Sequence, residues 1–511
     1  MTALIYEIIW IRPLSLVFGT TMYAVSTIVA SFILGLAIGS WIAGRFTDRL
    51  QNPLKYYAFI QILVGFFGIL LLPVFDLMPK VYLDLYHLTY PNQPVFMIAQ
   101  ILMSIVMIAI PATLMGTTLP LMLKTYSTEF RTIGKDVGKL DASNSIGAFF
   151  GTLAAGFLII PILGIHDGIL VTASINIILG TAILITKKYL NIKYVAIILI
   201  IIIPLLAFYP SYDEKRLANA IFLADQTWTM ENYENSVEEQ DLLFYKESIY
   251  QNVMVTSFND EKLLRLDGKT QCNTRDSVAR GLINMGSLPF NLYTINYGPP
   301  QTALNIGLGC GITSHALSKN LETTTIEIDP AVVEASKFFY DSIDHRLIID
   351  DARNWLLRND EKFDMITSEP TEPWMGWTLY TKEHFEILSN SVTELGVVAQ
   401  WIPVYELAGD EAMIMYNTFH SVFPYVYVYQ MEPGKTTQLI FIGSQHELKI
   451  KENNLYLFNQ DDVKDVKTEL NTDNKPIIEF ATANSLYRSV NEPVRFAFNN
   501  EEIYKKLNML D

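Results

Sequence analysis

Long apolar runs recur from the first residue to Tyr209, and only short polar loops separate them. A run of about 20 apolar residues is long enough to cross a bilayer core as a helix. The sequence therefore predicts a multi-pass α-helical membrane domain of about seven spans over residues 1–209. The first run is expected to stay as a helix, because no small-residue cleavage site precedes the further spans. The expected spans lie near residues 3–19, 20–43, 56–78, 95–120, 142–163, 168–186 and 194–209.

Small and polar residues mark positions inside these spans where helices meet or where function is concentrated. The pairs Gly35 with Gly39 and Gly147 with Gly151 have the small-xxx-small spacing that allows close helix packing. Polar side chains within a span are candidates for function, and the alternative is interhelical pairing or a helix-end position. The polar candidates are Glu7, Trp10, Arg12, Asp141, Ser143 and Asn144.

The charges of the loops predict an orientation. Ten basic residues fall in loops on one side, whereas the opposite loops offer little beyond Lys80. The positive-inside rule places the basic group in the cytoplasm, so a crossing at 194–209 leaves everything after Tyr209 outside it. A cofactor made in the cytoplasm favours the other side, and the sequence leaves this conflict open. The basic residues are Arg45, Arg49, Lys55, Lys124, Arg131, Lys135, Lys139, Lys187, Lys188 and Lys193.

The rest of the 511-residue chain is acidic. Residues 1–209 carry 12 Lys and Arg against 8 Asp and Glu, which leaves 25 against 45 for residues 210–511. An acidic domain is a poor binder of nucleic acid, and its charge either attracts cationic substrates such as polyamines or only solvates the surface. The only cysteines, Cys272 and Cys310, exclude a cysteine-rich metal site, and their pairing stays open. No cluster with metal-ligand spacing occurs, so no metal is expected.

A glycine-rich turn organises the acidic half. Residues 303–306 form a predicted buried strand, and Gly307-Leu308-Gly309-Cys310-Gly311 leads from it into a helix at 314–320. The glycines allow a sharp turn and close approach of a ligand. A second strand at 323–328 carries Glu327 about 18 residues beyond the glycines, where a nucleoside ribose offers its hydroxyls. This context favours a nucleoside-binding domain, and the alternative is a tight turn in an ordinary βαβ unit.

Strands and helices alternate from Thr302 onwards, which is typical of a Rossmann-like, doubly wound parallel sheet of the class I methyltransferase type. Gly307–Gly311, Glu327, Asp351 and Glu369 follow successive strands, and ligands bind such sheets at the carboxyl ends of their strands. Alternating residues from 242 to 267 predict a small β-hairpin subdomain before the sheet. We expect a membrane domain at 1–209, a connector at 210–240, the hairpin subdomain with a helix at 241–290, the nucleoside-binding domain at 291–445 and an α/β extension at 446–511.

The motifs of this half resemble the spermidine synthase (polyamine aminopropyltransferase) family, and most closely its bacterial members fused to a transporter-like membrane domain. The similarity covers most of residues 242–488. The loop Gly39–Arg49 also resembles a loop of major-facilitator transporters. The matching segments are Tyr250-Gln251-Asn252, Leu266–Gln271, the glycine turn, Ile326–Pro330, Asp350–Asn354, Ser368–Trp374, Leu379–Thr381, Gln400-Trp401 and Leu470–Pro476.

The resemblance implies a role for each nucleoside-site residue. Gln251 and the glycines Gly307, Gly309 and Gly311 would line the site. Glu327 would hold the ribose hydroxyls, and Asp351 with the backbone of Ala352 would meet the adenine edge. The co-substrate would be S-adenosylmethionine or its decarboxylated form, and no metal would be required.

The resemblance also implies the catalytic and amine-binding residues. Glu369 would stand where the family has its catalytic aspartate, with Glu372 nearby, and Tyr380 would close the pocket. Trp374 would wall the pocket or stack on an amine through a cation–π contact, with loop packing as the alternative. Of the stretch that grips the polyamine, only Asp276 is recognisable. The acids of the catalytic loop are each one methylene longer than in the family.

The sequence therefore predicts a membrane-bound transferase that moves an aminopropyl or related group from a sulfonium nucleoside to a small-molecule amine such as a polyamine. A carboxylate suits this chemistry, because it accepts the proton of the attacking amine and holds a cationic substrate. The alternatives are a methyltransferase and a non-catalytic transporter-like protein with a nucleoside-binding domain. The expected partners are the amine and the lipid bilayer, with no nucleic acid. The oligomeric state stays open, with a homodimer as one option.

Overall fold

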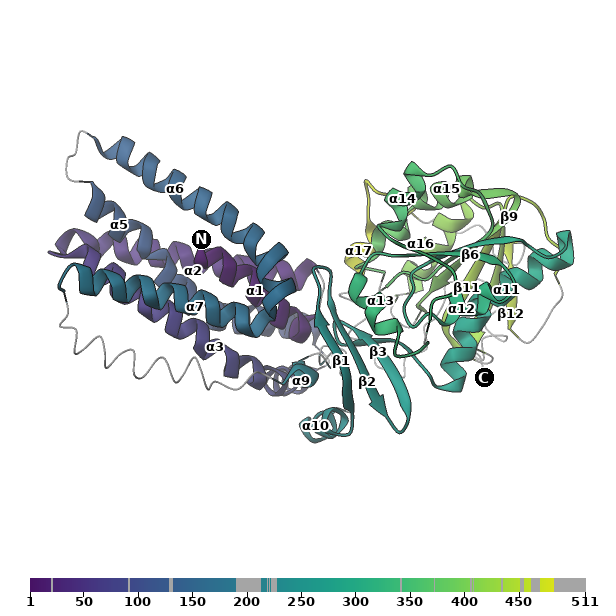
Figure 1. Ribbon diagram of the computed structural model, residues 1–511, viewed down its shortest axis with the longest axis horizontal. Helices are drawn as coiled ribbons and strands as arrows, with labels where there is room; N and C mark the ends of the chain where they lie inside the picture. Colours follow the sequence, from purple (N-terminus) through teal and green to yellow (C-terminus); the bar gives the residue numbers. More distant parts are fainter. Residues whose placement is uncertain are drawn as a thin grey trace. The chain divides into compact units, whose positions relative to one another are not determined.

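The chain forms two compact units in a computed structural model (Figure 1). The first unit contains Met1–Val237 and Glu247–Gln251, and the second contains Glu238–Lys246 and Asn252–Asp511. Each unit is described by itself. The structure describes residues 1–481 except 20–21, 91, 128–131, 190–212, 218, 220, 222–227, 341, 372, 405–406, 408, 433–434, 451–454 and 461–468.

Helices make up the described part of the first unit, and its long helices lie side by side. Four helical stretches are long and apolar enough to cross a membrane, namely Tyr23–Arg49, Pro53–Thr89, Pro94–Tyr126 and Ile133–Thr186. The expected span at 194–209 lies outside the described residues. The helices are α1 (Thr2–Phe18), α2 (Met22–Phe46), η1 (Thr47–Arg49), α3 (Pro53–Thr89), α4 (Gln93–Gly116), α5 (Thr118–Tyr126), α6 (Ile133–Ala154), η3 (Ala155–Ile159), α7 (Ile160–Thr186), α9 (Glu214–Leu217) and α10 (Met230–Glu238).

Glycine determines both the packing and one break in this unit. A Cβ atom on Gly39 of α2 would lie 2.0 Å from the carbonyl oxygen of Thr113 on α4, and one on Gly151 would lie 2.6 Å from that of Met1. The predicted close approach at both glycine pairs is therefore confirmed. The expected spans 142–163 and 168–186 form one apolar stretch that breaks at Gly164 (φ 78°), because a left-handed residue interrupts the helical hydrogen bonds.

The second unit begins with a four-stranded antiparallel sheet, and the predicted hairpin subdomain is present. Its tight turns are Asn259-Asp260 and Asp267-Gly268, and all four residues have positive φ, as two-residue hairpin turns require. Helix α11 follows and runs to Tyr297, past residue 290, where the subdomain and its helix were expected to end. The elements are β1 (Asp241–Glu247), β2 (Asn252–Phe258), β3 (Glu261–Leu266), β4 (Lys269–Asn273) and α11 (Asp276–Tyr297).

The main sheet has eight strands in the order β12-β10-β11-β9-β8-β5-β6-β7. Strands β9, β8, β5, β6 and β7 are parallel neighbours, whereas β10, β11 and β12 pair antiparallel. This is the predicted Rossmann-like sheet, and antiparallel strands extend it on one side. The strands are β5 (Thr302–Ile306), β6 (Glu322–Glu327), β7 (Arg346–Ile349), β8 (Phe363–Ser368), β9 (Val392–Ile402), β10 (Tyr425–Glu432), β11 (Lys435–Ser444) and β12 (Tyr456–Asn459).

Helices cover both faces of this sheet, which is why its strands are apolar on both sides. Leu304 of β5 packs in the core under α14, α15 and α16, whereas its neighbour Ala303 packs in the core under α11 and α12. The helices are α12 (Ile312–Ser318), α13 (Pro330–Ser336), α14 (Ala352–Arg358), η5 (Trp377–Leu379), α15 (Lys382–Ser391), α16 (Gly409–His420) and α17 (Ile477–Ala481).

Candidate active site

Backbone hydrogen bonds continue the parallel ladder past the ends of four strands. They hold the segments after β8, β5, β6 and β7 side by side along one edge of the sheet, as the strand-end argument predicts. The spacing of these segments is thus fixed by the backbone and does not depend on side-chain packing. The bonds run from Glu369 N–H to Ile306 O (2.9 Å), from Gly307 N–H to Ile326 O (2.9 Å) and from Asp350 N–H to Glu327 O (3.1 Å).

The turn after β5 needs its glycines. Gly307, Gly309 and Gly311 have φ values of 91°, 51° and 79°, in the left-handed region where a side chain is strained. Gly307 also passes close to the segment after β8, because a Cβ atom there would lie only 2.7 Å from the carbonyl oxygen of Glu369. Gly311 forms the N-cap of α12. The glycines therefore bring the turn and Glu369 together.

A cavity that is partly open to solvent lies between this turn and Glu369. Its walls come from the glycine turn, the start of α12, the end of β4, helix α11 and the ends of β8, β9 and β11. The residues that line it are Gln271, Cys272, Leu282, Gly307, Leu308, Gly309, Cys310, Ile312, Thr313, Glu369, Pro370, Trp401 and Gln438.

Glu369 is the only acidic residue among those that line this cavity. Its Oε2 accepts a hydrogen bond from the hydroxyl of Thr313 (3.1 Å), while Oε1 is inaccessible to solvent and has no hydrogen-bond partner among the described residues. Burial raises the pKa of Glu369 to about 8, although the Thr313 bond acts in the opposite direction. A carboxyl group that has one oxygen without a hydrogen-bond partner among the described residues and a pKa near neutrality is suited to accept a proton.

Glu327 stabilises the glycine turn through a hydrogen bond to its backbone. Its side chain is buried, and its oxygens accept the backbone N–H groups of Leu308 (2.9 Å) and Asp329 (3.0 Å). Burial raises the pKa of Glu327, and these two N–H donors counteract that rise. Because a carboxylate offers about four acceptor sites, Glu327 retains capacity for ligand hydroxyls.

Comparison with known proteins gives a consistent result for this unit. Residues 242–455 match the sequence profile of the Spermine/spermidine synthase domain. The chain is 31% identical over 219 residues to the polyamine aminopropyltransferase of Yersinia pseudotuberculosis serotype O:1b (strain IP 31758), covering 40% of this chain and 69% of that protein. The chain belongs to the spermidine synthase family. It is therefore a transferase.

Two further relatives extend the comparison. The polyamine aminopropyltransferase of Serratia proteamaculans (strain 568) is 29% identical over 219 residues, covering 40% of this chain and 71% of that protein. The crystal structure of spermidine synthase from Thermotoga maritima aligns with 18% identity and a TM-score of 0.35, covering 53% of this chain and 88% of that chain.

Several residues to which the family resemblance gives a role lie outside the walls of the cavity. Asp351 caps α14 by accepting the N–H of Asn354 (2.7 Å), and Ala352 is buried in the adjoining core. Tyr380 is fully buried in that same core. Trp374 is buried as well, with the ammonium of Lys269 5.7 Å from its ring centroid.

The remaining predicted residues of the family site are not among the described residues that line the cavity. Gln251 is buried in the turn between β1 and β2, a turn that belongs to the first unit. Asp276 begins α11, and its side chain is outside the described structure. Glu372 lies outside the described residues. Within the described residues no group of three or more His, Cys, Asp or Glu side chains could hold a metal ion.

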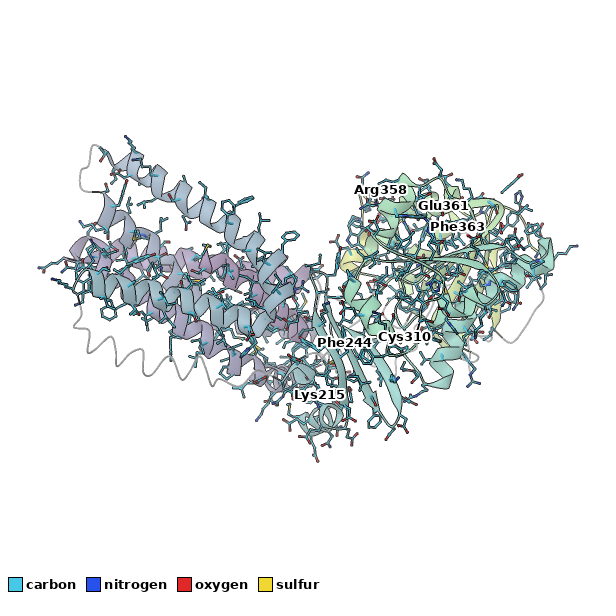
Figure 2. The ribbon with its side chains drawn as sticks, in the orientation of Figure 1. Lys215, Phe244, Cys310, Arg358, Glu361 and Phe363 are labelled. Atoms are coloured by element: carbon cyan, nitrogen blue, oxygen red, sulfur yellow. A yellow bond between two sulfur atoms is a disulfide. The ribbon has the colours of Figure 1, made fainter. Side chains whose placement is uncertain are left out.

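The structure adds wall residues that the sequence analysis did not assign. Cys272 and Cys310 form a disulfide that joins β4 to the glycine turn at the cavity (Cys310 is labelled in Figure 2). Trp401 donates its Nε1–H to Gln438 (3.0 Å) across the end of β9. Trp401 lies near the end of β9, which is parallel to β8, so the strand-end argument extended by one strand finds it. Gln438 comes from an antiparallel strand, whose register no local pattern reveals.

Proposed function

We propose that this protein is a membrane-bound aminopropyltransferase that uses decarboxylated S-adenosylmethionine and a small amine such as a polyamine. The observation that carries the proposal is the carboxyl group of Glu369, whose Oε1 has no hydrogen-bond partner among the described residues and which shares one cavity with the glycine turn. Polyamine aminopropyltransferases among its relatives support the reaction class. The four apolar helical stretches support attachment to a membrane.

The reaction forms one C–N bond and breaks one C–S bond. The amine nitrogen attacks the carbon beside the sulfonium, and the bonding pair leaves with sulfur to give neutral methylthioadenosine. The new ammonium then loses one proton, and Oε1 of Glu369 accepts it. The chain thereby supplies orientation and a proton acceptor, the two contributions that such a displacement needs.

The raised pKa of Glu369 fits this role. In the absence of a cation the buried carboxyl group is mostly protonated at pH 7, because its pKa is about 8. A cationic amine or a sulfonium in the cavity favours the ionised form, since an opposite charge within a few ångströms lowers the pKa of an acid. Glu369 would therefore ionise as its substrates arrive, and its charge would be complementary to theirs.

The nucleoside half of the site is assigned by the same proposal. The glycine turn would receive the nucleoside, and Glu327 would hold the ribose hydroxyls with its remaining acceptor sites. Gln251 and Asp351 with Ala352 would complete the nucleoside site, Tyr380 and Trp374 would support the amine side, and Asp276 and Glu372 would add negative charge there.

The test uses the full-length protein in detergent with putrescine and a donor labelled in its aminopropyl group. We expect label in the amine and release of methylthioadenosine. Glu369→Gln should lower the rate by about 100-fold or more, as removal of a general base typically does. Glu322→Gln, an exposed acid at the opposite end of β6, is the matched control.

Other products would refute the proposal in identifiable ways. S-Adenosylhomocysteine formed from S-adenosylmethionine would make the protein a methyltransferase. Nucleoside binding without turnover, equal in the native chain and in Glu369→Gln, would make the site a sensor.

A further inference from the structure

A disulfide forms part of the wall of the proposed active site. Cys310 lies between Gly309 and Gly311, and Cys272 lies near the end of β4. Both line the cavity, and their Cα atoms are 6.2 Å apart. The bond thus ties the glycine turn to a different sheet. Stable disulfides form in oxidising compartments outside the bacterial cytoplasm and are rare within it.

The helical unit independently has one basic end. Lys124, near the end of the stretch Pro94–Tyr126, lies 3.9 Å from Asp48, near the end of the stretch Tyr23–Arg49. Late α7 reaches the same end, because Gly180 packs against early α3 at Ala58, and Lys187 follows. The positive-inside rule assigns this end to the cytoplasm. The described basic residues that follow or precede the helices there are Arg45, Arg49, Lys55, Lys124, Lys187 and Lys188.

The chain leaves the helical unit at the other end. Asp213, where the described chain resumes, lies with its backbone N–H beside Asp76, and α9 packs on the distal part of α3. The loop at 90–92 and the turn around Gly164 carry no Lys or Arg. Figure 1 shows α9 at the end of α3 that is remote from α5. The described chain therefore resumes at the end of the helical unit opposite the basic loops.

The turn Glu247–Gln251 is at that same end. The carboxylate of Glu247 accepts the backbone N–H of Ile165, the residue directly after the Gly164 break. Arg12 of α1 donates to the carbonyls of Ser248 (3.2 Å) and Ile249 (2.7 Å). Residues before and after β1 thus both meet the end that lacks the basic loops.

We infer that the transferase domain lies on the non-cytoplasmic side of the membrane, where the Cys272–Cys310 disulfide forms and fixes the glycine turn of the active site. The inference rests on the proposed membrane attachment, and it resolves the conflict between loop charge and cofactor source in favour of loop charge. Two independent observations, the disulfide and the exit point of the chain, lead to the same side.

Formation of the bond requires an oxidant of stated class. The two thiols give up two protons and two electrons to the disulfide of a thiol–disulfide exchange protein, which becomes a dithiol.

The inference also constrains how the substrates reach the active site. Both the amine and the sulfonium nucleoside must be present outside the cytoplasm, so the donor must be carried across the membrane as a charged nucleoside before transfer occurs.

The first experiment measures the thiols of the unaltered full-length chain. Cells are quenched in acid, and the protein is treated with a maleimide polymer under denaturing conditions, with or without prior reduction. Because the chain has only two cysteines, we expect no mass shift without reduction and a shift of two polymers after it. A shift of two polymers without reduction would overturn the inference.

The second experiment measures sidedness directly. In a chain carrying Cys272→Ser and Cys310→Ser, one cysteine is introduced at an exposed site, either Lys319→Cys in the transferase unit or Lys135→Cys on α6. Intact cells are treated with a membrane-impermeant maleimide. We expect labelling of the first variant in intact cells and of the second only after permeabilisation.

The reverse labelling pattern would overturn the inference. If the cysteine-free chain does not accumulate, the thiol measurement on the native chain still decides. Neither readout depends on turnover, so a protein that is external but inactive would refute the proposed function alone. An active enzyme with free thiols and cytoplasmic labelling would refute this inference alone.

Discussion

At the scale of single residues, Glu369 makes the site sensitive to pH. For an acid that is harder to ionise in the folded than in the unfolded protein, folding takes up a proton. The stabilising contribution of Glu369 is therefore complete below its ordinary pKa of 4.5 and is lost as the pH rises to about 8. We expect the midpoint temperature of unfolding to fall over this range less in Glu369→Gln than in the native chain. Parallel curves would contradict the assigned pKa.

Thr313 tunes this acid. Thr313→Val removes the one hydrogen bond that favours ionised Glu369, so the pKa of Glu369 should rise. A hydrogen bond to a charged group contributes about 1.5–3 kcal/mol, so the rising limb of kcat/KM against pH should move by about one pH unit to higher pH.

Ser318→Ala is the control for Thr313→Val, because the Ser318 hydroxyl on the same helix bonds only to the backbone of α12 among the contacts described. An unchanged profile in Thr313→Val, or an equal shift in the control, would argue against Glu369 as the proton acceptor.

At the scale of elements, two glycines distinguish the effect of backbone strain from the effect of close approach to a neighbouring segment. Gly307 and Gly298 have similar φ values of 91° and 87°, but only Gly307 has a neighbour within 4 Å of its Cβ position. Replacement by alanine should cost each about 1–2 kcal/mol of strain. Gly307→Ala should also push the segment at Glu369 aside and abolish nucleoside binding, measured by calorimetry. Equal binding by both variants would show that the close approach is unimportant.

The disulfide is the second device at this scale. Closing a loop with a sequence separation of 38 residues should stabilise the folded unit by about 4 kcal/mol in the chain-entropy estimate. We expect reduction by a thiol to lower the midpoint temperature of unfolding of the native chain. The midpoint of the double variant that carries Cys272→Ser and Cys310→Ser should not change. A similar response of both proteins would mean that reduction acts elsewhere.

Local patterns predicted the elements that carry the site, and the physical reason is visible in particular residues. A buried strand, three glycines and an acid after the next strand are adjacent in sequence, so Gly307, Glu327 and Glu369 could be placed on one sheet edge. The Cys272–Cys310 bond and the wall residue Gln438 depend on pairing between distant strands, which no local period encodes. The length of α11 was underestimated because its apolar face continues through Pro289.

At the scale of the whole molecule, the two units are joined by three chain crossings, because Glu247–Gln251 returns to the helical unit. A protease site inserted between Val237 and Gln240 should therefore leave the two fragments associated in detergent after cleavage. Arg12→Ala with Glu247→Ala removes the contacts that hold the turn and should let the fragments separate on size exclusion.

Arg45→Ala, which removes a guanidinium 3.7 Å from the ring centroid of Trp41 at the basic end, is the control for the loss of a charged side chain. Separation of the fragments in the chain without substitutions would show that the turn does not hold them.

The returning turn also affects how this protein should be handled in the laboratory. A shortened version that begins after the helices would keep Glu247 and the carbonyls of Ser248 and Ile249 but lose the groups that satisfy them. It would expose a negatively charged turn directly before Gln251, and this turn precedes strand β2 in the sequence. Poor yield or weak activity of such a fragment would then reflect the loss of the contacts from Arg12 and Ile165 to this turn. Activity should therefore be assayed with the intact polypeptide.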